Sequence, residues 1–230
     1  MNNRIFSFVF ARGGSKGIPK KNLLEIDGIP LVGHSINMSK SINNVERTFL
    51  STDCDQIANA GEKYGAEIIK RPKNLAEDDS PEWLAWIHAI NFAKLAYGDF
   101  DVFLSLPTTS PLRATIDVKN CLEKITHPNI DAVITICESN RSPWFNMVKK
   151  DNEKLSLLIS ENKIYRRQDS PISYDITTLA YVLKTDFIRV ANNIWEGNVV
   201  GVEIPRERSI DIDNYLDYEI ANYLYHNKLS

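Results

Sequence analysis

Short apolar runs alternate with stretches of helical spacing along most of the chain. The runs are rich in β-branched and aromatic side chains, which predicts buried strands over residues 5–10, 47–50, 67–69, 102–106, 132–136 and 199–204. Between them, apolar residues recur at helical intervals over residues 30–40, 55–64, 81–97 and 116–125, and an amphipathic pattern over 215–225 predicts a closing helix. This alternation predicts an α/β fold with a mainly parallel sheet and helices on both faces.

One segment interrupts the alternation. Residues 141–176 carry polar side chains, two Ser-Pro pairs and weakly amphipathic pieces. Long loops inside compact domains are usually functional or disordered, and the aromatic and aliphatic content here argues against disorder. We interpret the chain as a single domain, 1–230, with an insertion over 141–176 that serves as a lid or a dimerisation arm.

Composition narrows the classes of function. The 230 residues are 43% hydrophobic and 25% charged, with a net charge of −3. Cationic and anionic side chains are interleaved, so we expect neither a nucleic-acid partner nor a membrane. The first residues lack the features of a signal peptide, and three separated cysteines form no disulfide framework, so we expect a cytoplasmic protein with core cysteines.

The richest motif follows the first predicted strand. Residues 11–22 contain three glycines and four cationic side chains. Glycines let backbone N–H groups approach a polyphosphate, and Arg12, Lys16 and Lys21 can add charge-assisted hydrogen bonds. The spacing matches neither a dinucleotide-binding nor a P-loop motif. A phosphate-binding loop is therefore predicted at the position where α/β folds bind phosphates.

A second cluster, residues 209–213, lies near the end of the chain. Alternation places Asp211 and Asp213 on one face, with Ile210 and Ile212 on the other. Two adjacent carboxylates beside a triphosphate suit Mg²⁺. The alternative is that Asp213 simply caps the helix that begins near Asn214.

Residues 11–22 closely resemble the motif of the acylneuraminate cytidylyltransferases, the CMP-sialic acid synthetase family. The resemblance continues through residues 27–31, 51–53, 71–76 and 109–113 and the Asp211/Asp213 pair, and so spans nearly the whole chain. It implies a Rossmann-like nucleotidyltransferase fold with CTP as the nucleotide substrate and Mg²⁺ as the cofactor. It also implies a homodimer in which a small inserted dimerisation subdomain reaches the active site of the partner subunit.

The resemblance also assigns roles to residues. Arg12, Lys21 and Asp211 would be catalytic, and Asp211 and Asp213 would bind the metal. Nucleotide binding would fall to Ala11, Arg12, Gly13, Gly14, Ser15, Lys16, Lys21, Asn22 and Arg71. The sugar hydroxyl would then attack the α-phosphorus in line, while cations neutralise the charge on the phosphate oxygens.

The sugar-binding part departs from the sialic acid pattern. Pro107 stands where those enzymes commonly carry glutamine, and Asp175 stands where they carry a base. Arg166 and Arg167 compete as partners of the sugar carboxylate, since arginine suits bidentate recognition; both could instead be surface residues. The expected sugar-binding residues are Thr108, Thr109, Ser110, Arg166, Arg167 and Asp175.

The leading hypothesis is transfer of CMP from CTP to an acidic nonulosonic sugar of the sialic, legionaminic or pseudaminic type. The nearest alternative is CMP-3-deoxy-octulosonate synthesis. A CTP-binding regulator without turnover and a scaffolding protein are further alternatives, which the intact carboxylate pair and the phosphate loop argue against.

Overall fold

A seven-stranded sheet forms the centre of the protein. The computed structural model describes residues 3–160 and 164–227. The strand order is β11-β7-β10-β6-β1-β4-β5, and the strands are β1 (Ile5–Phe10), β4 (Val45–Thr52), β5 (Glu67–Lys70), β6 (Val102–Ser105), β7 (Ala132–Glu138), β10 (Tyr174–Lys184) and β11 (Val199–Glu203). β10 runs antiparallel to both neighbours, and the other pairs are parallel. The predicted α/β fold with a mainly parallel sheet is confirmed.

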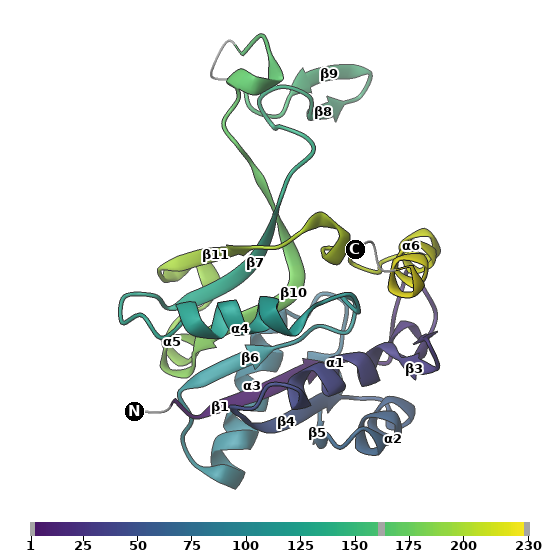
Figure 1. Ribbon diagram of the computed structural model, residues 1–230, viewed down its shortest axis with the longest axis vertical. Helices are drawn as coiled ribbons and strands as arrows, with labels where there is room; N and C mark the ends of the chain where they lie inside the picture. Colours follow the sequence, from purple (N-terminus) through teal and green to yellow (C-terminus); the bar gives the residue numbers. More distant parts are fainter. Residues whose placement is uncertain (1–2, 161–163, 228–230) are drawn as a thin grey trace.

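Helices cover both faces of the sheet (Figure 1). Their bounds are α1 (Leu31–Lys40), α2 (Asp55–Lys63), α3 (Glu82–Tyr97), α4 (Thr115–Lys124), α5 (Thr185–Val190) and α6 (Tyr215–His226). One core cluster joins α1, α2 and α4 to one face through residues such as Ile36, Ile57 and Val118. Another joins α3 and α5 to the opposite face through Trp86 and Ile188. Each of these five helices therefore buries an apolar stripe against the sheet, whereas α6 packs through Ala221 on a separate cluster with Ile18 and Ile212.

The sequence pattern located the strands and helices that it predicted within one or two residues, but it did not predict every element. It missed β10, α5 and the hairpin of β2 (Glu25–Ile26) and β3 (Ile29–Pro30). β10 begins at Tyr174, so the last three residues of the expected insertion belong to the sheet. Short 3-10 helices lie at η1 (Lys21–Leu23), η2 (Lys73–Leu75), η3 (Arg167–Asp169), η4 (Ile194–Glu196) and η5 (Arg206–Arg208).

An arm projects from the sheet between β7 and β10 (Figure 1). It carries the hairpin of β8 (Val148–Asp151) and β9 (Lys154–Leu157), followed by η3. At the root of the arm the two sheet strands pair with each other, with Glu138 opposite Tyr174. Lys163, in one of the amphipathic pieces expected from the sequence, lies outside the described residues.

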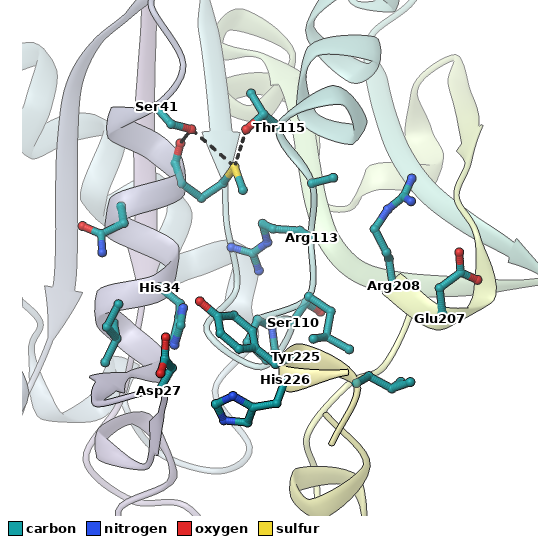
Figure 2. Close-up of a pocket in the computed structure, with 17 residues that line it drawn as sticks. Asp27, His34, Ser41, Ser110, Arg113, Thr115, Glu207, Arg208, Tyr225 and His226 are labelled. Carbon is teal, nitrogen blue, oxygen red and sulfur yellow. Dashed lines mark hydrogen bonds between the residues drawn. The ribbon is translucent and has the colours of Figure 1, made fainter. Parts of the chain in front are cut away.

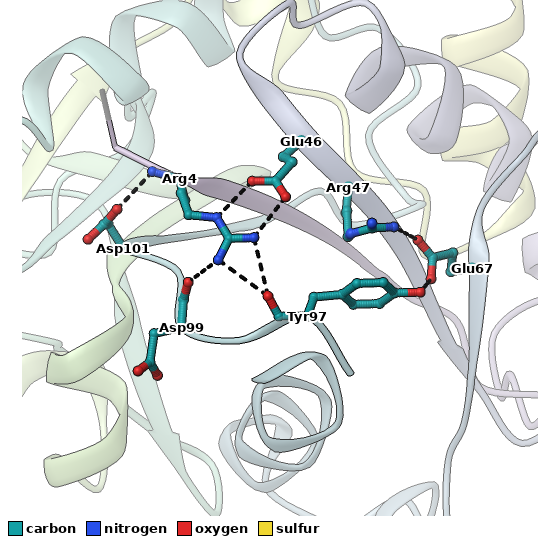
Figure 3. A network of polar contacts seen from close by, with 7 residues as sticks. All are labelled: Arg4, Glu46, Arg47, Glu67, Tyr97, Asp99 and Asp101. Atoms are coloured by element: carbon teal, nitrogen blue, oxygen red, sulfur yellow. Dashed lines mark hydrogen bonds and ion pairs between the residues drawn. The ribbon is translucent and has the colours of Figure 1, made fainter. Parts of the chain in front are cut away.

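The amino ends of the central strands are tied by a polar network (Figure 3). Arg4 donates to both carboxylate oxygens of Glu46, at 2.9 and 2.8 Å. Arg47 lies 3.5 Å from the centre of the Tyr97 ring and donates to Glu67 at 2.7 Å. Because Arg4 directly precedes β1, this network stabilises the end of the sheet at which the parallel strands begin, opposite their carboxyl ends.

Within residues 3–160 and 164–227, none of the helices has the length and apolar composition needed to cross a membrane.

Candidate active site

The candidate site lies at the carboxyl ends of the parallel strands. β1 pairs with β4 on one side and β6 on the other, so the order in which the chain adds strands to the sheet reverses at β1. Ligands of open α/β sheets bind at such a switch point. The predicted phosphate loop follows β1, and the segment that carries Asp211 and Asp213 follows β11.

Backbone contacts fix the start of the phosphate loop. The Ala11 N–H donates to the Ser51 carbonyl at 3.1 Å, and the Gly13 N–H donates to Asp53 Oδ1 at 2.9 Å. A Cβ on Gly13 would lie 3.0 Å from the Cβ of Cys54, so the loop passes tightly over the end of β4. Asp53 therefore shapes the loop, a role that the sequence alone did not reveal.

Two cations of the loop share one carboxylate. Arg12 Nη1 lies 2.6 Å from Asp78 Oδ1, and Lys16 Nζ lies 2.7 Å from Asp78 Oδ2. Lys16 is 77% exposed, whereas Arg12 is 33% exposed. The Lys16 ammonium and the Arg12 guanidinium together hold the pKa of Asp78 below its usual range. Gly14 is exposed and Ser15 is half-buried beside them, so the loop presents its cations and backbone toward solvent.

Lys21 joins the phosphate loop to the acidic segment. Its ammonium donates to the Ile212 carbonyl at 2.7 Å and lies 3.1 Å from Asp213 Oδ1. Only 15% of the Lys21 side chain is exposed, against 74% of Asp213. Lys21 thus contacts two residues that lie 191 and 192 positions further along the chain. A cation therefore lies beside the acidic segment that is expected to bind metal.

Asn22 lies beneath the loop rather than at its surface. Its amide donates to the Arg12 carbonyl at 2.9 Å, and Thr108 donates to Asn22 Oδ1 at 2.5 Å. Asn22 and Thr108 are both buried. These two expected ligand-binding residues hold each other and the loop backbone.

The loop after β6 contacts β10 and the acidic segment. Thr109 accepts a hydrogen bond from the Ile212 N–H at 2.9 Å through its carbonyl oxygen. The hydroxyls of Ser110 and Thr178 lie 2.8 Å apart. Thr109 and Ser110, expected at the sugar, therefore border the acidic segment on one side and the base of the arm on the other.

Arg71 is buried at the end of β5. It is 7% exposed and donates to Ser51 Oγ at 3.1 Å and to the Ser51 carbonyl at 2.8 Å. Its guanidinium also lies 5.5 Å from the centre of the Phe10 ring. Burial lowers the pKa of Arg71, while the nearby Asp53 opposes that effect. Arg71 is thus a rigid cation in the floor of the site.

Asp211 faces a protein interior that lacks a partner for it. Within the described part of the chain, its buried Oδ1 atom has no hydrogen-bond partner. Burial, together with the charges of Glu82 and Asp211, raises the pKa of Tyr181 to about 12. Burial also raises the pKa of Glu82, whose carboxylate accepts from Trp86 Nε1 at 3.2 Å. More than a third of Glu82 is nevertheless exposed, so the residue also reaches solvent.

Glu82, Tyr181 and Asp78 were not recognised as site residues in the sequence. Asp78 lies in an acidic run, Glu82 lies in a stretch with the spacing of a core helix, and Tyr181 lies in the strand that the pattern missed. A carboxylate directly at the start of an aromatic helix was the available signal for Glu82.

The donor set suits magnesium bound together with a triphosphate. In the part of the chain that the structure describes, no three His, Cys, Asp or Glu side chains gather into a ready-made metal site. Mg²⁺ usually takes one or two carboxylates and completes its shell with phosphate oxygens and water. The unpartnered Oδ1 of Asp211 fits such a role. Asp213 does not cap α6, because Asn214 accepts from the Asp217 N–H and occupies that position.

Three expected sugar-binding residues lie in the arm or at its root. Arg166 and Arg167 are exposed in the arm, where Arg166 pairs with Asp169 at 2.8 Å. Asp175 is exposed at the root of the arm, opposite Cys137 on β7.

Of the three cysteines expected in the core, Cys121 and Cys137 are buried, but Cys54 is only partly buried under the phosphate loop.

A separate cavity of about 880 Å³ opens between α1, α6 and the start of α4 (Figure 2). The rings of His34 and Tyr225 pack edge to face on its wall, with centres 5.3 Å apart, and Ser110 and Arg113 line it from the loop after β6. Burial lowers the pKa of Arg113 to about 9, and its guanidinium donates to Ser35 at 2.9 Å. The cavity adjoins the candidate site through Ser110 but contains neither the phosphate loop nor Asp211.

Comparison with known proteins identifies the family. The family model described as cytidylyltransferase matches residues 7–195. The flagellin modification protein B of Campylobacter coli is 28% identical over 98% of this chain and 97% of its own. The CMP-N,N'-diacetyllegionaminic acid synthase of Campylobacter jejuni is 29% identical over 96% of this chain and 94% of its own. N-acylneuraminate cytidylyltransferase B of Danio rerio is 29% identical, and the match spans 50% of that protein.

Solved structures share the fold. A CMP:2-keto-3-deoxy-manno-octonic acid synthetase complexed with CTP matches with a TM-score of 0.73 at 15% identity, over 98% of this chain and 100% of that one. A 4-diphosphocytidyl-2C-methyl-D-erythritol synthase matches with a TM-score of 0.73 at 9% identity, over 98% of this chain and 99% of that one. Because the cytidylyltransferase model covers most of its length, the chain belongs to this family of nucleotidyltransferases.

Proposed function

We propose that this protein transfers CMP from CTP to the anomeric hydroxyl of a nonulosonic acid of the sialic, legionaminic or pseudaminic type and releases pyrophosphate. The observation that carries the proposal is the contact of Lys21 with Ile212 and Asp213, which joins a cationic phosphate loop to two carboxylates. The similarity to a legionaminic acid synthase over nearly the full length of both chains supports the sugar class.

The reaction is an in-line displacement at phosphorus. The sugar's anomeric oxygen forms a bond to the α-phosphorus, and the bond from that phosphorus to the departing pyrophosphate breaks. Arg12, Lys16 and Lys21 would neutralise charge on the triphosphate as it develops. The hydroxyl proton would pass to Asp211 or to a water beside it.

Asp211 and Asp213 would hold a magnesium ion. The metal would supply positive charge at the phosphate oxygens. Lys21, fixed between the Ile212 carbonyl and Asp213, would keep these carboxylates beside the phosphate loop.

Thr109, Ser110 and Asp175 remain our candidates for the sugar. Thr109 and Ser110 lie at the junction of β6, β10 and the acidic segment. Asp175 lies on the same strand as Thr178, three residues closer to the arm. An acidic side chain there would suit a hydroxyl, an amine or an amidine substituent of the sugar.

The eight-carbon 3-deoxy-octulosonic acid is the second candidate substrate. The similarity to a synthetase for that class is one of fold, at 15% identity. The curated relatives with the higher identities, 28 and 29%, include a nine-carbon sugar synthase. The nonulosonic acids are therefore the leading class.

We further propose that two copies of the chain assemble and that the arm of one copy completes the site of the other. The arm exposes apolar side chains to solvent, namely Phe145, Val148, Leu155, Leu158, Tyr165 and Ile172. Such a surface is typical of an interface. Arg166 and Arg167 lie at the start of η3 in this arm, which projects from the sheet (Figure 1), so either could pair with the sugar carboxylate in a partner's site. The free cysteines fit a reducing, cytoplasmic location.

The first test is pyrophosphate release by the purified protein with CTP, Mg²⁺ and a panel of sialic, legionaminic, pseudaminic and octulosonic acids. Release with CTP and a nine-carbon acid, and not with ATP, GTP or UTP, is the expected result. Release only with the eight-carbon acid would select the second candidate. CTP binding without release across the panel would point to a nucleotide-binding regulator.

A mixing experiment tests the contribution of the arm. One variant lacks the metal ligand (Asp211→Asn) and the other lacks both arm cations (Arg166→Ala with Arg167→Ala). Each should be inactive alone, whereas a mixture that has exchanged subunits should regain about a quarter of wild-type activity, because mixed dimers contain one intact site. Light scattering gives the oligomeric state, and an active monomer would exclude the proposed assembly.

A further inference from the structure

The acidic segment has an anchor ahead of its carboxylates. The segment enters from η5, and Arg208 is the last residue of that 3-10 helix, three positions before Asp211. Arg208 Nε donates to Asp117 Oδ2 at 2.9 Å, and Arg208 Nη2 donates to Asp117 Oδ1 at 2.7 Å. A bidentate pair of this kind fixes direction as well as distance.

Asp117 is itself rigidly placed. Its side chain is 4% exposed, and its Oδ2 atom also accepts from the Ala114 N–H at 2.9 Å. It belongs to the first turn of α4, which directly follows the Thr109–Ser110 loop. Arg208 is more open, at 28% exposure, and stands on the wall of the cavity beside Glu207 (Figure 2).

The same loop holds the segment a second time, beyond Asp211. The Ile212 N–H donates to the Thr109 carbonyl, and the Ile212 side chain is fully buried with Ile18 and Leu31. Asp211 therefore lies between two fixed points of the segment. One is the ion pair of Arg208, and the other is the backbone hydrogen bond and buried side chain of Ile212. The second attachment would survive the loss of the first.

We propose that Arg208 is a positioning residue, whose ion pair with Asp117 sets the direction from which Asp211 approaches the metal and triphosphate. This inference rests on the proposed function for the identity of the metal–nucleotide complex. Groups that orient metal ligands typically change metal affinity or activity about 10–100-fold when removed.

The test compares Arg208→Lys and Arg208→Gln with matched variants at Arg206, an exposed arginine in the same 3-10 helix. Mn²⁺ binding in the presence of CTP is measured by electron paramagnetic resonance, and CTP binding without metal by calorimetry. Both Arg208 variants should bind Mn²⁺ about tenfold more weakly and show kcat lowered about 10–100-fold. CTP affinity without metal and the KM for the sugar should stay within about twofold, as for the Arg206 variants.

Arg208→Lys keeps the positive charge beside the buried carboxylate, so it retains a folded protein if Arg208→Gln does not. Mn²⁺ affinity and kcat of folded Arg208→Lys equal to those of Arg206→Lys would overturn the inference. An equal loss of Mn²⁺ affinity and of metal-free CTP binding would also overturn it, because it would indicate general loosening. Absence of turnover in the wild-type protein would count against the proposed function, while the Mn²⁺ measurement would still decide the role of Arg208.

Discussion

The α-carbon of Gly17 packs directly against the backbone carbonyl oxygen of Asp213, so closely that a Cβ at position 17 would overlap that oxygen. A loop near the start of the chain and a segment near its end thus fit together without space for one methyl group.

Gly17→Ala should therefore displace the acidic segment. A shift of about 1 Å in catalytic groups can cost about 100-fold in rate, and we expect a loss of kcat of that order. Steady-state pyrophosphate release measures it. Thermal unfolding of Gly17→Ala and of the wild type separates a displaced segment from a general loss of stability, because the Cβ would overlap the Asp213 carbonyl oxygen. A Gly17→Ala enzyme with wild-type kcat would show that the segment does not need this contact.

Asp78→Asn should tighten CTP binding. Asp78 pairs with both Arg12 and Lys16, and a triphosphate must replace that carboxylate to reach them. Exposed ion pairs are weak, so we expect a decrease in the dissociation constant of about threefold. Calorimetric titration of CTP measures it, with Asp79→Asn as the neighbouring control. Weaker binding in Asp78→Asn would mean that the carboxylate organises the loop for the nucleotide instead.

Alkylation of Cys54 should block nucleotide binding. Cys121 is fully buried and burial raises the pKa of its thiol to about 12, whereas Cys54 is partly exposed. An adduct on Cys54 would push against Gly13, whose α-carbon lies directly over it. N-ethylmaleimide should lower CTP affinity about tenfold, the usual scale of overpacking. CTP should slow the labelling, and Cys54→Ala should make the protein resistant. Inactivation of Cys54→Ala at the wild-type rate would locate the sensitive thiol elsewhere.

Asp211→Asn should abolish turnover and raise thermal stability. The buried Oδ1 of Asp211 has no hydrogen-bond partner among the described residues, and a buried acceptor without a hydrogen bond destabilises a fold. We expect kcat to fall at least about 100-fold and the melting temperature to rise by a few degrees, roughly the effect of 1 kcal/mol. Thermal unfolding and pyrophosphate release measure the two effects. A lower melting temperature would indicate that the carboxylate has a structural partner in solution.

Stability should fall as the pH drops below about 6.5. Burial lowers the pKa of His34 in the folded protein, so the unfolded chain, with a pKa near 6.5, takes up its proton first. Stabilisation by neutral His34 is therefore present above the unfolded pKa and is lost as pH falls. Burial lowers the pKa of His88 as well, so both histidines contribute to the slope.

Denaturant titrations between pH 5.5 and 7.5 measure this slope. His34→Gln retains a donor toward the Ile26 carbonyl, which His34 Nε2 contacts at 2.9 Å, and should reduce the pH dependence. His88→Gln should reduce the remainder. A His34→Gln profile parallel to that of the wild type would exclude His34 as a source.

The sequence allowed prediction of the parallel strands because their buried runs are short and uniformly apolar. β10 escaped because Thr177 and Thr178 interrupt its pattern and a register shift lies between Thr177 and Tyr181. The contributions of Asp53, Asp78 and Glu82 depend on which loops meet at the edge. Such meetings follow from tertiary structure and not from local spacing, and the same is true of the pairing of Arg208 with Asp117.

The antiparallel direction of β10 has a consequence for how this protein can diversify. Because β10 runs opposite to its neighbours, it enters the sheet at the end where those strands leave it. A two-stranded stem beside the candidate site therefore carries the arm. Glu138 and Tyr174 close that stem, and residues beyond them can change in length and sequence without altering the register below. Under the proposed function, the arm that recognises the sugar and the residues that act on the phosphate can therefore change independently, as separate modules of one chain.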